Sequence, residues 1–144
     1  MAIPWLARLA AIGLLLVVGA CAHRQPIPLD STDSRYGGYL SQVRERIKSR
    51  WSYPCVDDKA TGRCEHLNAR LLLEFGITTD GRVPYVTVRE SSGLPIYDAS
   101  AVNAVKAAAP FPPMPPEVMA QVPPGSRGVT VSATFNYVVE KPRP

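Results

Sequence analysis

The sequence predicts a small α+β fold, a three-stranded antiparallel sheet with two helices packed on one face. Three segments alternate apolar and polar residues, the period of a half-buried strand, and two segments repeat apolar residues every three to four positions, as amphipathic helices do. Their order is helix, strand, strand, helix, strand. Because each element has a single apolar side, the helices must cover one face of the sheet. A chain of 144 residues has room for one such domain.

The first helix is predicted over residues 36–51. Charged residues fill the side that faces away from the apolar stripe. Pro54 ends the helix, because the residue before a proline avoids the α region. The apolar stripe consists of Tyr36, Leu40, Val43, Ile47 and Trp51.

A hairpin follows over residues 69–89. Residues 69–78 alternate as a half-buried strand, Asp80-Gly81 supplies a tight turn, and residues 83–89 form the returning strand. The second helix carries Ala101, Val102, Val105 and Ala108 and ends before Pro110. Asp98 lies where a carboxylate favours the N-terminal dipole of that helix.

A proline-rich connection occupies residues 110–128 and leads to the last strand. We expect it to be an extended strap, ordered by its apolar contacts across the core. A ligand for a proline-binding module is the alternative. The last strand shows the longest alternation in the chain, over residues 129–140.

The N-terminus has the pattern of an export signal. Arg8 precedes an apolar run over residues 9–20, which is shorter than the ~20 residues of a membrane span. The next residue is Cys21, and Val18-Gly19-Ala20-Cys21 resembles a bacterial lipobox. We therefore expect a signal peptide at 1–20, a lipidated Cys21 with a tether at 21–34, and a domain at 35–141. The alternative is an uncleaved membrane helix over residues 3–20.

The other two cysteines form an even pair. Export permits a disulfide, so Cys55 and Cys64 are predicted to be joined. A metal site with His66 and His23 is the competing interpretation, but the spacing matches no usual ligand set. No metal and no cofactor are expected.

No catalytic residues are predicted, and the protein is not expected to be an enzyme. The histidines lack an ordered nucleophile and a matching carboxylate, and adjacent Asp57 and Asp58 are typical of a solvated turn. The net charge of +4 comes from scattered Lys and Arg without interleaved aromatic residues, so nucleic acid is not an expected partner.

The last strand is the predicted binding site, because an edge strand offers unpaired backbone groups to an extended peptide. An edge blocked by the strap or by homodimerisation is the alternative. The strand comprises Val129, Thr130, Val131, Ser132, Ala133, Thr134, Phe135, Asn136 and Tyr137.

Several landmarks in order resemble the C-terminal domain family of TonB and TolA. They are Trp51-Ser52-Tyr53-Pro54, the string from Phe75 to Val83, Glu90-Ser91-Ser92-Gly93, Tyr97-Asp98 and Pro110-Phe111-Pro112-Pro113-Met114-Pro115. The resemblance implies a three-stranded sheet with two helices that binds peptide segments of outer-membrane receptors or periplasmic proteins, often along the last strand.

The chain differs from the energy transducers of that family before the domain. Those proteins have an inner-membrane helix and a long linker, whereas this chain has a lipobox and a short tether. Ala22 after the cysteine suggests outer-membrane sorting. We therefore expect a lipid-anchored periplasmic interaction module, accessory to transport across the outer membrane. A transducer with an uncleaved helix is the alternative.

Overall fold

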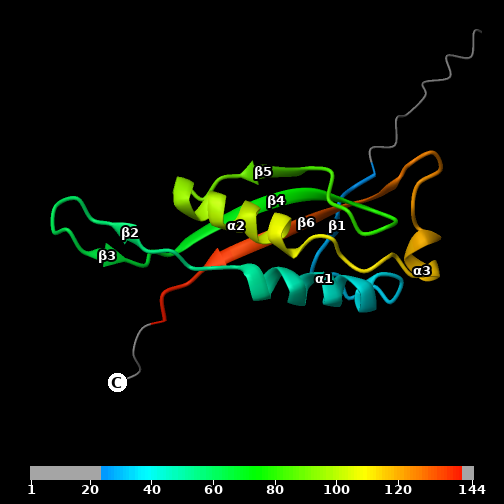
Figure 1. Ribbon diagram of the computed structural model, residues 1–144, viewed down its shortest axis with the longest axis horizontal. Helices are drawn as coiled ribbons and strands as arrows, with labels where there is room; N and C mark the ends of the chain where they lie inside the picture. Colours follow the sequence, from blue (N-terminus) through cyan, green and yellow to red (C-terminus); the bar gives the residue numbers. More distant parts are fainter. Residues whose placement is uncertain (1–23, 141–144) are drawn as a thin grey trace, which may run out of the picture.

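The computed structural model describes residues 24–140, so Cys21, His23 and the predicted signal peptide lie outside the described residues. The domain is elongated, with its helices lying along a twisted sheet (Figure 1). In chain order the elements are β1 (Ile27–Pro28), α1 (Gly37–Arg50), β2 (Val56–Asp57), β3 (Cys64–Glu65), β4 (Ala69–Thr78), β5 (Val86–Glu90), α2 (Pro95–Ala108), α3 (Pro116–Met119) and β6 (Gly128–Tyr137).

The main sheet has the strand order β1-β6-β4-β5. β4 pairs antiparallel with β6 without interruption, from Ala69 opposite Tyr137 to Thr78 opposite Gly128. β5 pairs antiparallel with the other side of β4. The predicted fold class is confirmed. The difference is a short fourth strand, β1, which runs parallel to β6.

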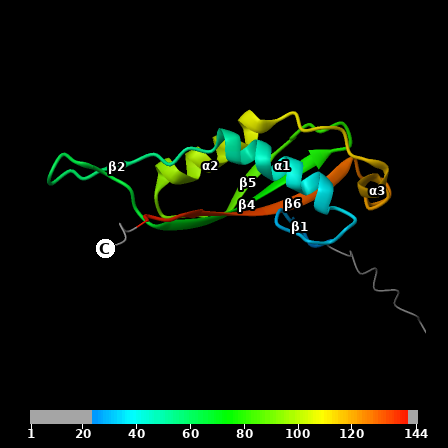
Figure 2. The same cartoon turned by 90° about the horizontal axis from the view of Figure 1, so that it is seen from below.

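Both long helices cover the same face of the sheet (Figure 2). Alternate residues of β4 and β6 point toward them and are buried, as the period-two pattern predicted. α1 buries the middle of its predicted stripe, while Tyr36 and Trp51 are half-buried at its ends. The largest side chains that are fully buried are Tyr97, Tyr137, Phe75, Leu40, Leu71, Leu73 and Ile77.

The turn between β4 and β5 depends on Gly81. Its φ of +88° is in the left-handed region, and a Cβ there would lie 2.0 Å from the carbonyl oxygen of Phe111. β5 starts later than the predicted Val83. Pro84 has no N–H for a ladder, and the Tyr85 ring lies against Gly76, where a Cβ would come within 2.6 Å of it.

The proline-rich connection is a strap, as predicted from its apolar residues. Phe111, Met114 and Val118 are buried in the core. The Phe111 N–H donates to the carbonyl of Gly81 (2.8 Å), which joins the strap to the β4–β5 turn. The sequence did not predict α3, a single turn that has a proline at its first position, where the missing N–H costs no hydrogen bond.

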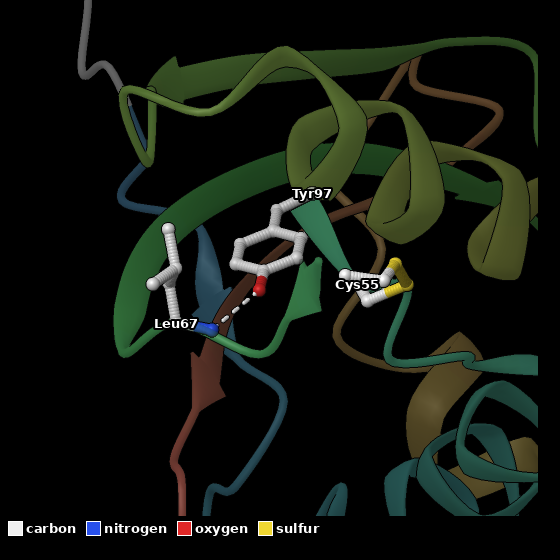
Figure 3. The surroundings of a disulfide bond; sticks show 4 residues. Cys55, Leu67 and Tyr97 are labelled. Carbon is white, nitrogen blue, oxygen red and sulfur yellow. Dashed lines mark hydrogen bonds between the residues drawn. A yellow bond between two sulfur atoms is a disulfide. The ribbon is translucent and has the colours of Figure 1, made fainter. Parts of the chain in front are cut away.

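A small arm projects from one end of the domain (Figure 1). It contains β2 and β3, and the predicted disulfide is present between Cys55 and Cys64, whose Cα atoms are 5.3 Å apart. At its base the Tyr97 hydroxyl accepts a hydrogen bond from the N–H of Leu67 (2.8 Å; Figure 3). The Tyr97 ring stacks on Tyr137 at 4.3 Å, so the arm is attached to the core through aromatic side chains.

Asp98 lies in the first turn of α2, as predicted. Its carboxylate also accepts hydrogen bonds from the Ser92 N–H (2.9 Å) and from the hydroxyls of Ser91 and Ser92. Burial raises the pKa of Asp98, but these hydrogen bonds outweigh burial and lower it. The carboxylate therefore fixes the loop between β5 and α2.

Candidate functional site

Two hydrogen bonds show in which direction the backbone N–H and C=O groups of β6 point. The Arg127 carbonyl accepts from the N–H of Thr79 (3.0 Å), on the β4 side. The Ser132 carbonyl accepts from the N–H of Leu29 (2.8 Å), on the opposite side. Because successive peptide groups of a strand alternate in direction, odd-numbered residues of β6 face β4 and even-numbered residues face outward.

Thr134 and Asn136 therefore present their backbone N–H and C=O groups to the outer side of β6. β1 pairs with Val131 and Ser132 and then ends. Beyond Ser132, no other strand within residues 24–140 pairs with this side of β6. The predicted edge strand is thus divided into a part that β1 covers and an open part.

The covering strand comes from the segment that the sequence predicted to be a tether. Instead of being a polar linker, its second half is folded, because Ile27 packs against the core and Leu29 is only 8% exposed. These two apolar residues are two positions apart, as in a strand. The segment was too short and too rich in proline for that pattern to be recognised. The folded part of the chain therefore begins earlier than the predicted boundary at residue 35.

A groove with a volume of about 230 Å³ runs beside the open part of β6. α1 forms one wall, and the turn after β1 closes one end. Ile47 and Phe135 are buried beneath it and give it an apolar floor. Its lining residues are Pro28, Leu29, Asp30, Arg44, Ile47, Lys48, Trp51 and Ser132 to Asn136.

The α1 wall carries positive charge. Arg44 and Lys48 are one helical turn apart, and both line the groove. Glu45 approaches both of them, at 4.0 Å and 3.4 Å, through side chains that are 36–65% exposed. Among the residues that line the groove, Asp30 is the one acidic side chain. The groove therefore has a net positive lining.

Trp51 forms the far end of this wall and is held rigidly. Its indole N–H donates to the Tyr137 hydroxyl (2.9 Å), which in turn donates to the carbonyl of Tyr97 (3.0 Å). The indole also meets the ring of Phe135 edge-on at 5.2 Å. These contacts fix the position of an aromatic surface at the groove, which favours binding because little rotamer freedom remains to be lost.

The other long edge of the sheet is β5, and it differs in character. Leu72 and Leu73 mark an irregularity in its pairing with β4. Arg89 forms a bidentate ion pair with Glu74 (2.7 and 3.0 Å), and Glu90 lies 3.6 Å from an arginine of β4. Charges and bulges of this kind discourage pairing with another strand.

The other described candidate residues, His66 and Asp58, have structural contacts in the arm. His66 packs its ring on Tyr53 at 4.7 Å. The Asp58 carboxylate accepts hydrogen bonds from the Ala60 N–H and the Thr61 hydroxyl (both 2.9 Å), which lower its pKa. The segment is an exposed turn, as predicted. Within residues 24–140 no three His, Cys, Asp or Glu side chains are grouped as metal ligands would be. In the same part of the chain, no helix has the length and apolar character of a membrane span.

The fold is that of a small α+β domain in which β1 covers part of the edge of β6. Residues 36–130, more than half of the chain, match the family described as TonB C terminal. The chain belongs to the TonB C-terminal family, which confirms the prediction from the sequence. Domains of this family are non-catalytic protein-interaction modules of the periplasm.

Two solved structures are similar to this chain. One is the TonB C-terminal domain of Helicobacter pylori, with 22% identity, coverage of 72% of this chain and 97% of that one, and a TM-score of 0.49. The other is TolAIII bound to a peptide derived from the N-terminus of TolB, with 20% identity, coverage of 81% and 82%, and a TM-score of 0.46. No curated protein matches the chain significantly.

Proposed function

We propose that the domain binds an extended segment of a periplasmic partner by adding it as a strand to β6 beyond Ser132. The outward-facing backbone groups of Thr134 and Asn136, beside a groove, are the observation that supports this function. Together they offer two N–H donors and two C=O acceptors. Backbone hydrogen bonds would supply affinity, and alternate side chains of the segment would enter the groove and supply specificity.

The site suits a short segment. β1 blocks extension past Ser132, and β6 ends at Tyr137. About five residues of a bound strand fit in this interval, since a strand advances ~3.3 Å per residue. The partner is therefore expected to contribute a linear motif, such as an extended region of an outer-membrane receptor or of another envelope protein.

Photocrosslinking in cells tests this proposal. A photoreactive residue replacing Asn136 should trap a periplasmic protein, because this exposed side chain borders the open part of β6. The matched control is Thr87, which is also exposed on the same face of the sheet but lies in β5. Cross-links of equal yield at the two positions, or none at Asn136, would contradict strand addition at β6.

We propose further that acyl chains on Cys21, palmitate among them, hold the domain on the periplasmic side of the outer membrane, where it is accessory to transport. The motivation is the lipobox-like string before Cys21. Because β1 begins at Ile27, the intervening residues reach at most ~20 Å from the anchor. The open part of β6 would then meet partners only close to the bilayer.

Mass spectrometry of the protein from membranes tests the anchor. An acylated Cys21 at the mature N-terminus is the expected result, and Cys21→Ser should release the domain into the soluble fraction. An intact Met1 would instead support a transducer with an uncleaved helix over residues 3–20.

A further inference from the structure

The end of the domain that carries α3 is also the end where the described chain begins. β1 and α3 lie toward this end, and the disulfide arm projects from the opposite one (Figures 1 and 2). Arg24, the first described residue, donates to the backbone carbonyl of Gln121 in the strap (2.9 Å). The chain therefore enters the domain beside the end of the strap.

A cavity with a volume of about 260 Å³ opens at this end of the domain. Arg24 and Arg35 both line it, and none of the described residues in its lining is acidic. The two guanidinium groups converge on one residue, because Arg35 donates to the side-chain carbonyl of Gln121 (3.2 Å) while Arg24 donates to its backbone. Two converging guanidinium groups are suited to bind a phosphate, whose oxygens accept their N–H groups.

Arg35 is held in place before any ligand binds. Its Nε and Nη2 donate to the carboxylate of Asp33 (3.0 and 2.5 Å), and its guanidinium lies 5.5 Å from the centre of the Tyr36 ring. Asp33 neutralises Arg35, but no carboxylate within residues 24–140 forms an ion pair with Arg24. The cavity therefore keeps one positive charge in excess.

The proposed acyl anchor would bring this cavity to the headgroups of the bilayer. Cys21 and Arg24 are three residues apart, so their Cα atoms are separated by at most ~11 Å. The headgroup layer is itself roughly 5–8 Å thick on each side of the hydrocarbon. Met119, two residues before Gln121, is 50% exposed and adds apolar surface near the arginines. Basic and apolar side chains together are typical of a surface that lies on an anionic membrane.

On the basis of the proposed anchor, we propose that this cavity binds the phosphate of an anionic phospholipid, such as phosphatidylglycerol, in the leaflet that holds Cys21. The phosphate would accept hydrogen bonds from Arg24 and from Nη1 of Arg35, in place of their exposed bonds to Gln121. Zwitterionic lipids carry the same phosphate without net charge, so the excess positive charge favours anionic lipid. Binding would turn this end toward the bilayer and point the disulfide arm into the periplasm.

Fluorescence quenching of the acylated chain in vesicles tests the inference. With Cys21 acylated and Cys55 joined to Cys64, Pro124→Cys supplies a single thiol for a fluorophore at an exposed position of this end. The quencher is phosphatidylcholine with a nitroxide on its headgroup. Adding phosphatidylglycerol to phosphatidylcholine vesicles should raise the quenching about threefold at low salt, and high salt should remove the increase.

Matched variants locate the effect. Arg24→Gln with Arg35→Gln should abolish the increase, whereas Arg50→Gln with Lys106→Gln removes the same charge from exposed positions of α1 and α2 and should preserve it. If the first pair lowers the melting temperature, Arg24→Gln alone, which precedes every helix and strand, should still reduce the increase by about half. A fluorophore at Ala60, in the disulfide arm, should show no increase.

Each contrary result has a definite meaning. An acylated chain whose quenching ignores phosphatidylglycerol or the two arginines, or rises equally at Ala60, overturns the inference but leaves the anchor in place. Loss of the increase on adding soluble glycerol phosphate at the concentration of the lipid would mean that the cavity takes free phosphate esters, which overturns docking on the membrane. A chain without acyl groups on Cys21 in mass spectrometry overturns the anchor and the inference together.

Discussion

The two long edges of the sheet are protected from unwanted pairing in different ways. β5 has five residues, an irregular register and charged side chains at Arg89 and Glu90. β6 has ten residues, regular pairing and neutral Thr134 and Asn136 at its open end. A long, regular and uncharged edge readily accepts a strand, whereas a short, bulged and charged edge does not.

The difference is consistent with the proposal that β6 is the edge that binds a partner. On β6, β1 pairs with Val131 and Ser132, and the part beyond Ser132 borders a groove that Trp51 lines. No residue of β5 lines that groove; Arg89 of β5 is instead engaged by Glu74 of the neighbouring strand. In the proposed function, binding at β6 requires that the short section beyond Ser132 stays unpaired.

The largest effect is expected from proline on each edge. Thr134→Pro removes an outward-facing N–H without breaking a β4–β6 hydrogen bond, so the yield of periplasmic cross-links from position 136 should fall roughly tenfold or more. Val88→Pro is the control, because the backbone N–H of Val88 also faces outward, on β5. Photocrosslinking measures the yield, and thermal melting checks the fold. An equal loss of binding in both variants would show that β6 and β5 do not differ in their role.

The next largest effect concerns the part of β6 that β1 covers. Leu29→Ala should lower the free energy of unfolding by about 2–3 kcal/mol, because the side chain is buried and anchors β1. Exchange of the N–H at position 29 should accelerate as its bond to Ser132 opens. Met119→Ala, at a half-exposed position, should cost under about 0.5 kcal/mol in urea unfolding. If Leu29→Ala and Met119→Ala lowered the free energy of unfolding by similar amounts, packing of Leu29 would not be what holds β1 in place.

A smaller change in stability is expected from removing the charges on β5. Arg89→Thr with Glu90→Thr should lower the free energy of unfolding less than Leu29→Ala does, because both ion pairs are exposed on at least one side. Light scattering should nevertheless show a larger average mass than for the parent chain, because β5 becomes more neutral. Arg63→Thr with Glu65→Thr, on the disulfide arm, should not change the mass. An unchanged mass in the β5 variant would show that its charges do not prevent pairing.

The smallest expected effect is on the pH dependence of the free energy of unfolding, through one aspartate near each edge of the sheet. Hydrogen bonds from Arg82 and Thr78 lower the pKa of Asp80 to about 2, and those from Arg35 lower the pKa of Asp33 to about 2. Since both values lie below the ordinary 3.8, the stabilisation is present above that pH and is lost as the pH falls through about 2. Asp80→Asn and Asp33→Asn should each flatten the decline in unfolding free energy between pH 4 and 2. Steeper curves would contradict the assignment.

The helices and long strands were predicted well because their patterns are local. The stripe from Tyr36 to Trp51 corresponds to α1 within one residue at each end, and residues 69–78 are β4. Each pattern reports which side of one element meets the core, and that is the same in any packing of these elements. The family landmarks, for the same reason, could be recognised in order along the chain.

The start of β5 and the helix α3 were not predicted, for reasons of tertiary contact. Pro84 and Tyr85 fit the alternation of a strand, but Tyr85 is placed by Gly76 of the facing strand. α3 is one turn within the proline-rich strap, held by burial of Val118. Neither feature has a periodic pattern long enough to detect.

The sequence by itself determined the α+β class, the five main elements, the family and the strand that carries the candidate site. Only the tertiary structure decided which part of that strand is open, because Ile27 pairs with Val131 more than a hundred residues further along the chain. It also brought Lys48 of α1 to face Thr134 of β6 across one groove. Local patterns encode which side of an element is apolar, whereas the occupancy of an edge depends on contacts between distant segments, which no local pattern records.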